Sequence, residues 1–174
     1  MGPPTYIKPY VNQLVELVKK YYGERLVSLA FFGSFVRGIF KENKSDLDLL
    51  LVLSETSESH CERIDEFVKN VLMPYYSSPE YINALRTLYL PPVSVVIYSQ
   101  DEARFFHDIY LDMTLWSEIL HDENSFLKSV LDAMRKKIDE WGSLRREISG
   151  KSFWILKPDL KIGEELIDKL KPLL

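Results

Sequence analysis

The spacing of apolar residues predicts one helix and three strands in the first hundred residues. Apolar side chains recur at helical spacing over residues 11–22, with charged side chains between them, and Gly23 follows as a stop signal. Residues 26–32 form a nearly continuous apolar run, which is typical of a buried strand. Similar runs over residues 46–53 and 93–98 predict two further strands.

Two segments between the second and third of these strands are expected to contain helix. Residues 64–72 carry an amphipathic stripe, and Pro74 should end it because proline lacks the backbone donor that a helix needs. Residues 81–90 fit a short helix or an irregular piece. A helix between two strands is the usual crossover of an α/β unit. We therefore predict an α/β (α+β) fold, with a small mixed β-sheet and helices packed mainly on one face.

The last fifty residues are expected to form a helical and extended appendage. The longest helical stripe covers residues 126–141. The segment 150–164 is aromatic and reads as extended, and a short helix is expected over residues 164–170. Phe153 and Trp154 should anchor this tail, either on the body of the protein or on a second subunit, so a homo-oligomer is one expected arrangement.

Composition narrows the choice of partners. A chain of 174 residues has the length of one domain, so we assign residues 1–122 to the main domain and residues 123–174 to a helix and tail that pack on it. The net charge of -4 gives no cationic excess for holding a nucleic-acid backbone, which favours small substrates or a protein partner. Positive charge gathers on the 126–141 helix and at Arg145 and Arg146, which we interpret as a solvated face.

The cysteine and histidine content excludes other classes of site. Cys61 is the single cysteine, so no intramolecular disulfide forms, and a reducing compartment such as the cytoplasm is expected. His60, His107 and His121 lack the paired spacing of a metal site. No apolar run reaches the ~18 residues of a membrane span, so no membrane association is expected.

Candidate chemistry gathers where the first strand ends and the second begins. Gly33 allows the backbone to come close to a ligand, and Ser34 is expected to cap a short helix over residues 35–40 whose N–H groups face an anion. Asp46 and Asp48 are two residues apart in a strand, so their side chains share one face. Gly33 and Ser34 would hold phosphate, and Asp46 and Asp48 would hold metal.

Two neighbouring carboxylates repel each other and resist burial unless a cation lies between them. Hard oxygen ligands on one face suit Mg²⁺ shared with substrate phosphates, with Mn²⁺ as the alternative ion. A structural interpretation competes with this one: Gly33 and Ser34 are only a turn, and Asp46 and Asp48 are the polar face of an edge strand. The apolar residues that follow Asp48 directly favour the metal site.

The combined pattern resembles the nucleotidyltransferase domain of the DNA polymerase β superfamily, and most closely its minimal nucleotidyltransferases. The family pattern is Gly-Ser, then Arg-Gly, then Asp-x-Asp at the start of a strand. In this chain the pattern is carried by Gly33, Ser34, Arg37, Gly38, Ser45, Asp46 and Asp48. The resemblance is close over residues 26–53 and weakens afterwards.

The resemblance implies a polymerase β palm-like fold and a metal-dependent enzyme. Such an enzyme transfers a nucleoside monophosphate from an NTP, with ATP as the first choice, to a hydroxyl group on a protein, an RNA or a small molecule. Asp46 and Asp48 would be the catalytic, Mg²⁺-holding residues. The nucleotide would be bound by Gly33, Ser34, Arg37 and Ser45. Arg37 has an alternative role, fixing its own loop through local carbonyls, and Ser45 can also steady the loop before the second strand.

The third strand departs from the family pattern. Members usually carry a third metal-binding carboxylate there, whereas this chain has Ser94. Asp112 is the other acid considered as a replacement, although a helix cap or a solvated residue is its simpler interpretation. The alternative function is therefore a catalytically weak nucleotide-binding or antitoxin-like partner-binding module that retains the fold. Because minimal nucleotidyltransferases often work beside a helical HEPN protein, a partner of the HEPN type is expected.

Overall fold

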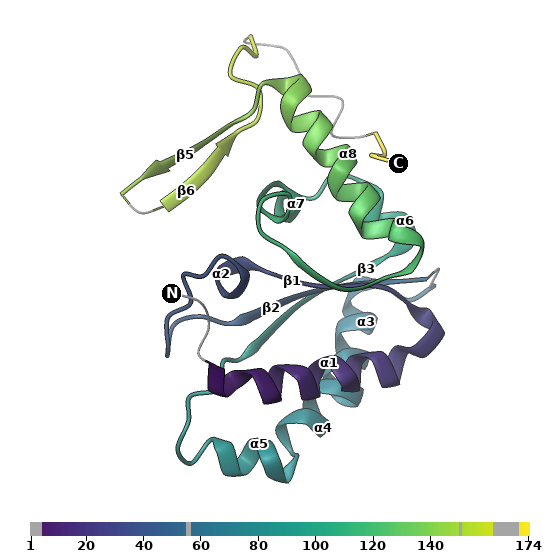
Figure 1. Cartoon of the computed structure of the whole chain (residues 1–174). Coiled ribbons are helices and arrows are strands. Elements are labelled where there is room, and N and C mark those ends of the chain that lie inside the picture. The colour runs from purple at the N-terminus through teal and green to yellow at the C-terminus, as the bar shows by residue number, and fades with distance from the viewer. Residues whose placement is uncertain (1–4, 55–56, 150, 162–170) are drawn as a thin grey trace.

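The computed structural model describes residues 5–54, 57–149, 151–161 and 171–174, and Figure 1 shows a central sheet with helices on both sides. The strands of this sheet are β1 (Leu26–Phe32), β2 (Leu47–Leu53), β3 (Val93–Ser99) and β4 (Glu118–Asp122). The helices are α1 (Lys8–Tyr22), α2 (Gly33–Val36), α3 (His60–Phe67), α4 (Met73–Tyr76), α5 (Pro79–Ala84), α6 (Gln100–Ala103), α7 (Asp108–Met113) and α8 (Phe126–Trp141). A separate hairpin consists of β5 (Leu144–Ile148) and β6 (Lys151–Ile155).

The main sheet is mixed, with the strand order β3-β2-β1-β4. β1 runs antiparallel to β2 and to β4, and β2 runs parallel to β3. The parallel pair is connected through α3, α4 and α5, since parallel strands need a long crossover. The predicted α/β fold with a small mixed sheet is therefore confirmed, and the strands predicted over residues 26–32 and 93–98 lie where expected.

β2 is an interior strand on which two layers of helices pack. Leu49 and Leu51 belong to the core formed with α1, α3 and α4, whereas Leu50 and Val52 belong to the core formed with α7 and α8. All four side chains are fully buried. The prediction of helices mainly on one face therefore needs correction, because α7 and α8 cover the second face (Figure 1). A strand with an unbroken apolar run requires burial on both sides.

The helix after β2 does not stop at Pro74, contrary to the prediction. α3 continues through a π-helical turn, Val68–Leu72, into α4, and Pro74 lies in the first turn of α4. Proline removes one backbone donor from a continuing helix, and the change from α- to π-helical hydrogen bonding occurs in the turn directly before it. In the part of the chain that the structure describes, no helix combines the length and the apolar character needed to cross a membrane.

The edge strand β4 was not predicted, and its last residue connects the sheet to α8. Asp122 Oδ1 accepts a hydrogen bond of 2.8 Å from the Leu127 N–H, and Oδ2 accepts one of 3.0 Å from the Lys128 N–H. The Ser28 hydroxyl donates to the same carboxylate at 2.7 Å. Asp122 thus satisfies free N–H groups at the start of α8, which spans the predicted residues 126–141.

The β5–β6 hairpin extends from the end of α8 toward the side of the molecule on which α2 lies (Figure 1). Of the extended segment predicted over residues 150–164, residues 151–155 form β6, the second strand of a hairpin whose first strand was not predicted. Residues 150 and 162–164 lie outside the described residues. Trp154 is partly buried and donates from Nε1 to Asp112 Oδ1 at 2.9 Å, whereas Phe153 is exposed, so one of the two predicted anchors contacts the body. The helix predicted over residues 164–170 lies outside the described residues.

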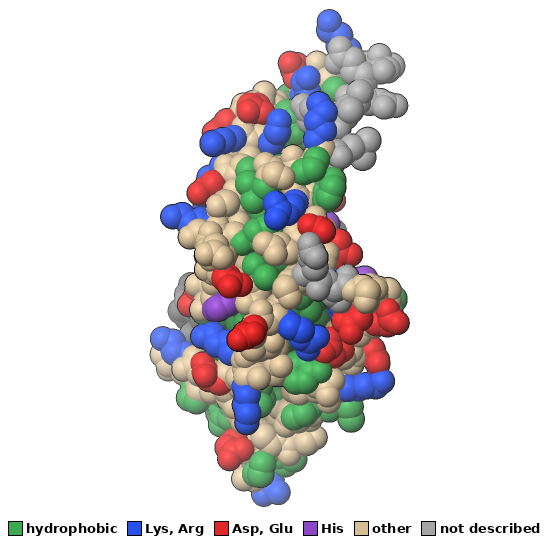
Figure 2. All heavy atoms as spheres, turned by 90° about the vertical axis from the view of Figure 1, so that its right-hand side faces the viewer, with side chains coloured by type: hydrophobic (Ala, Val, Ile, Leu, Met, Phe, Trp, Pro, Cys, Tyr) green, Lys and Arg blue, Asp and Glu red, His purple; other side chains and the backbone are tan. Residues whose placement is uncertain are grey.

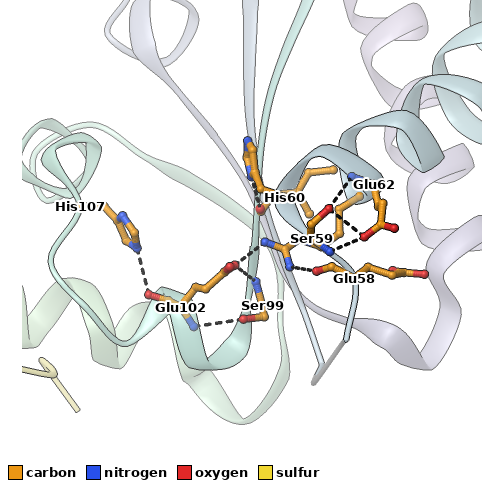
Figure 3. Close-up of polar contacts among 9 residues, drawn as sticks. Glu58, Ser59, His60, Glu62, Ser99, Glu102 and His107 are labelled. Atoms are coloured by element: carbon orange, nitrogen blue, oxygen red, sulfur yellow. Dashed lines mark hydrogen bonds and ion pairs between the residues drawn. The ribbon is translucent and has the colours of Figure 1, made fainter.

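A buried arginine connects two helices at the carboxyl ends of β2 and β3. Ser59 caps α3, and Ser99 forms a capping box with Glu102 at the start of α6. Arg63 on α3 is 2% exposed and donates from Nη2 to Glu102 Oε2 at 2.5 Å and from Nη1 to the Glu58 carbonyl at 2.7 Å (Figure 3). This network fixes the end of the sheet that lies opposite the candidate site.

Candidate active site

Strand pairing brings the two sequence motifs together. Phe32, the last residue of β1, pairs with Asp48 near the start of β2, so Gly33 lies directly beside Asp48. The parallel pairing of β2 and β3 places Ser94 on the other side of Asp48. Asp48 faces the α7 and α8 layer, because Leu50, two residues further along the strand, is part of that core.

Only glycine fits at position 33 without rearrangement. Gly33 has a φ of +72°, which is unfavourable for other residues, and an added Cβ would lie 2.0 Å from Asp48 Oδ2. The sequence predicts that the Gly33 backbone comes close to a ligand, and this role stays a prediction. The close group in the structure is the Asp48 carboxylate itself.

Ser34 does not cap the following helix, contrary to the expectation. α2 begins at Gly33, Phe32 occupies the N-cap position, and no side chain caps the helix. The helix predicted over residues 35–40 is therefore shorter and earlier than expected. Because Gly33 turns the chain immediately after β1, the helical turn starts there, and Gly38 follows with a φ of +70° that ends it.

Asp48 carries the strongest electrostatic perturbation of the site. Burial, followed by the charge of Asp46, raises the pKa of this carboxyl to about 6, while a hydrogen bond from the Ser94 hydroxyl acts in the opposite direction. Asp46 is exposed and lies one residue before β2. The charge of Asp46 thus acts on the half-buried Asp48 where β2 begins.

These two carboxylates fit the oxygen-rich, partial coordination that Mg²⁺ takes when substrate phosphates complete its shell. A divalent cation would stabilise the ionised form of both acids and so offset the burial and the charge repulsion that raise the Asp48 pKa. Within the described ranges, no three His, Cys, Asp or Glu side chains form a group that could hold a metal. Asp112 therefore does not complete a three-carboxylate site with Asp46 and Asp48, and Ser94 occupies the neighbouring strand position.

Ser45 stabilises the loop that leads into β2. Its side chain is buried, and its Oγ accepts a hydrogen bond of 2.9 Å from the Lys41 N–H. The Tyr89 hydroxyl donates to the Ser45 carbonyl at 3.2 Å. These contacts agree with the expected loop-steadying role, and a role of Ser45 in nucleotide binding stays a prediction.

Arg37 reaches away from its own loop toward α7. Its Nη1 lies 3.8 Å from Asp112 Oδ2, and its guanidinium lies 4.7 Å from the centre of the Trp116 ring. Arg145 on β5 contacts the same two residues: its Nε donates to Asp112 Oδ1 at 3.4 Å, and its guanidinium also lies 4.7 Å from the Trp116 ring centre. Asp112 lies inside α7, so its interpretation as a helix cap is wrong. Its carboxylate contacts both arginines and so joins Arg37 to the hairpin.

A pocket of about 520 Å³ opens between the end of β1, α7 and the segment that carries β6. Its lining residues are Phe32, Gly33, Asp108, Ile109, Leu111, Asp112, Trp154 and Leu156. The pocket is mostly apolar and has Gly33 at one side, so a ligand held at Gly33 has room for an apolar part.

Figure 2 shows the face of the molecule that lies on the right-hand side of Figure 1. On this face, lysine and arginine side chains lie among acidic and neutral ones without forming a continuous basic tract.

Sequence reasoning missed Arg145 and Trp116 as neighbours of the site. Arg145 was interpreted as part of a solvated basic face. In the hairpin Arg145 pairs with Trp154, and both side chains reach Asp112. The two-residue alternation of residues 144–155 could have indicated that they share a face, but not what that face contacts.

A family model for the nucleotidyltransferase domain matches residues 11–103 of this chain. The match contains β1, α2, β2 and β3, and therefore every site residue predicted above. No curated protein sequence is significantly similar to the chain.

Several solved structures resemble the fold. One is a mutant toxin–antitoxin complex, MntA–HpeT, with 14% identity, a TM-score of 0.41, and coverage of 75% of this chain and 91% of that chain. Another is spectinomycin adenyltransferase AAD(9) from Enterococcus faecialis with ATP and spectinomycin, with 17% identity, a TM-score of 0.45, and coverage of 79% and 69%. A third, a tri-AMPylated HEPN toxin from Shewanella oneidensis with MNT antitoxin, has 13% identity, a TM-score of 0.41, and coverage of 78% and 92%.

Proposed function

We propose, from the premise that this chain belongs to the nucleotidyltransferase domain family, that it transfers a nucleoside monophosphate from an NTP to a hydroxyl acceptor and releases pyrophosphate. ATP is the first NTP to test. The observation that carries the proposal is the contact between Gly33 and the Asp48 carboxylate, which joins a close-approach backbone turn to a pair of acids.

In this proposal Asp46 and Asp48 hold Mg²⁺, with Mn²⁺ as the alternative ion. The metal supplies charge neutralisation for the triphosphate and the acceptor oxygen, which is what phosphoryl transfer chiefly needs besides alignment. The half-buried position of Asp48 supports this assignment, because a carboxylate with an unfavourable charge environment gains most from a cation.

The chain's own residues align the substrate. The backbone of Gly33 and Ser34 would contact the β- and γ-phosphates, since Gly33 lets the chain turn with a φ of +72° directly beside the Asp48 carboxylate. The guanidinium of Arg37 would pair with the same phosphates, and its contacts with Asp112 and Trp116 fix its direction. Ser45 would contribute by keeping the loop before Asp46 in place.

A second candidate function is a nucleotide-binding or partner-binding module with weak or no catalysis. Ser94 favours it, because a hydroxyl at this strand position supplies no charge for a second metal or for accepting the proton of the attacking hydroxyl. A helical protein of the HEPN type is the partner that the family resemblance suggests for either function. It is also the first protein acceptor to test.

The test is incubation of the purified chain with α-labelled NTPs, Mg²⁺ or Mn²⁺ and candidate acceptors. Wild-type protein should transfer label, and Asp48→Ala should lose at least about a hundredfold in rate, because metal-based charge stabilisation contributes several kcal/mol to such reactions. Asp65→Ala is the matched control, since Asp65 is exposed and paired with Lys69 on the outer surface.

Two outcomes separate the candidates. Binding of Mg-ATP without any transfer would favour the weak binding module. Transfer at the wild-type rate by Asp48→Ala would contradict the proposed site.

A further inference from the structure

We infer that Arg145 is a second phosphate-binding guanidinium of this site, which the β5–β6 hairpin brings beside Arg37 to contact the terminal phosphates of the bound NTP. The inference rests on the proposed function. Arg145 lies outside residues 11–103, the part that the family model matches, so the family pattern does not assign it.

Arg37 and Arg145 form one cluster although more than a hundred residues separate them in the chain. Both guanidinium groups lie 4.7 Å from the centre of the Trp116 ring, and both contact the Asp112 carboxylate. A guanidinium over an aromatic face is oriented as well as attracted. The cluster therefore holds two planar cations in defined positions.

In this cluster the positive charge exceeds the negative charge, and one hydrogen-bond donor lacks a partner in the part of the chain that the structure describes. Two positive charges share a single carboxylate, whose nearest distances are 3.8 Å to Arg37 and 3.4 Å to Arg145. Arg145 Nη2 is buried and has no hydrogen-bond partner among the described residues. Phosphate oxygens provide the planar acceptor pair that a guanidinium binds best. An oligophosphate is thus the ligand class that would balance the excess positive charge at Asp112.

The cluster also lies beside the pocket that Gly33 lines. Asp112, which contacts both arginines, and Trp154, the cross-strand partner of Arg145, line the same pocket as Gly33. Arg37 directly follows α2, whose first residue is Gly33. A nucleotide whose phosphates lie at Gly33 would therefore extend its terminal phosphates toward the two arginines, with the apolar part of the pocket beside it.

Asp112 is a positioning residue in this scheme. An isolated two-stranded hairpin is marginally stable in water, so its placement depends on its contacts with the body. Arg145 and Trp154 both bond to Asp112 Oδ1, which fixes the inner face of the hairpin against α7. Asp112 thereby keeps Arg145 near the pocket without contacting the reacting atoms itself.

The test is the binding of ATP, AMP and pyrophosphate to the full chain in Mg²⁺, measured by titration calorimetry. Arg145→Gln should weaken ATP and pyrophosphate by about tenfold to a hundredfold, the size expected for a lost hydrogen bond to a charged group, and should leave AMP unchanged. Arg146→Gln is the matched control, because it removes the same charge from the adjacent, exposed position on the other face of β5. It should change none of the three affinities.

A further variant guards against misfolding. Arg145→Lys keeps the charge but loses the planar fork, and its affinity for ATP should lie between those of wild type and Arg145→Gln. Should Arg145→Gln fail to show a wild-type thermal transition, the test passes to Arg145→Lys, which must weaken ATP more than AMP.

Three results would overturn the inference. Equal ATP affinities for wild type and Arg145→Gln exclude a phosphate contact, and equal weakening of ATP and AMP excludes a contact with the terminal phosphates. In both cases the proposed function survives if the wild-type chain transfers label and Asp48→Ala does not. A wild-type chain that binds none of the three ligands overturns the proposed function and this inference together.

Discussion

At the scale of single residues, Asp48 concentrates the electrostatics of the site. Burial, followed by the charge of Asp46, raises its pKa to about 6, while the hydrogen bond from Ser94 acts in the opposite direction. The contact with Gly33 prevents the carboxylate from escaping toward solvent on that side without moving the backbone. Asp48 therefore destabilises the metal-free fold whenever it is ionised, and a bound cation would remove this cost.

We expect Asp48→Asn to stabilise the metal-free protein in a pH-dependent way. Below pH 3.8, the ordinary value of an aspartate, the carboxyl is protonated in both states and the variant gains nothing. Between pH 3.8 and about 6 the unfolded chain releases this proton while the folded chain keeps it, so wild-type stability falls through this window. Above it the variant should be more stable by about 1–2 kcal/mol, less than the full shift implies because the side chain is partly solvated.

Urea denaturation in EDTA from pH 3.5 to pH 7.5 measures this difference. Asp65→Asn, at an exposed position, serves as the control and should follow the wild-type curve. A constant difference between Asp48→Asn and wild type at every pH would show that Asp48 titrates normally in the folded state.

At the scale of elements, strand register decides which side chains meet. The sequence pattern correctly indicated strands over residues 26–32 and 93–98 and a strand over 46–53, which in the structure begins one residue later. Short apolar runs bounded by turn signals are consistent with buried strands. It did not indicate β4 or β5, whose outward residues are largely exposed. The pairing of Asp48 with Ser94 follows from the parallel register of β2 and β3. That Ser94 stands where the family usually has a third carboxylate stays a prediction from the resemblance.

We expect Ser94→Asp to raise the affinity for Mg²⁺ in the presence of ATP by roughly tenfold or more, because it adds a charge next to the two existing carboxylates. Ser94→Asn has nearly the same shape without the charge and should leave the affinity near wild type. Calorimetric Mg²⁺ titrations of the two variants in the presence of ATP measure these affinities. If both variants bind Mg²⁺ equally, the side chain at position 94 does not reach the metal.

At the scale of the whole molecule, the two ends of the sheet carry different tasks. The candidate site lies where β1 ends and β2 begins, and the Arg63 network lies where β2 and β3 end, about 17 Å away for five residues of extended strand. Arg63 joins α3 to α6 through Glu102 and is almost completely buried. The buried ion pair is therefore separate from the candidate site.

We expect Glu102→Gln to lower the free energy of unfolding by about 2–3 kcal/mol, because it leaves the buried guanidinium of Arg63 without its counter-charge. Arg63→Met should cost less, since it removes the buried charge and keeps the apolar packing. Although burial works to raise the pKa of Glu102, the hydrogen bonds from Arg63 and Ser99 hold it below its usual value of 4.5. Stability from this ionised group is therefore present above pH 4.5 and is lost as the pH falls further.

Urea denaturation at pH 7 and pH 4 measures these differences, with ATP binding at pH 7 as the control for the distant site. A larger loss for Arg63→Met than for Glu102→Gln would show that the arginine matters for its packing rather than for its charge.

The sequence by itself determined the local features: the apolar strands, the helix over residues 126–141, the glycine that a tight approach requires at Gly33, and two acids two residues apart at the start of a strand. Each depends on residues close together in the chain, where periodicity and backbone sterics act directly. Only the tertiary structure decided that both faces of the sheet are covered, that Ser94 lies beside Asp48, and that Arg145 meets Arg37 at Asp112. These contacts join segments far apart in sequence, and their partners are selected by packing and charge in three dimensions, which no local pattern records.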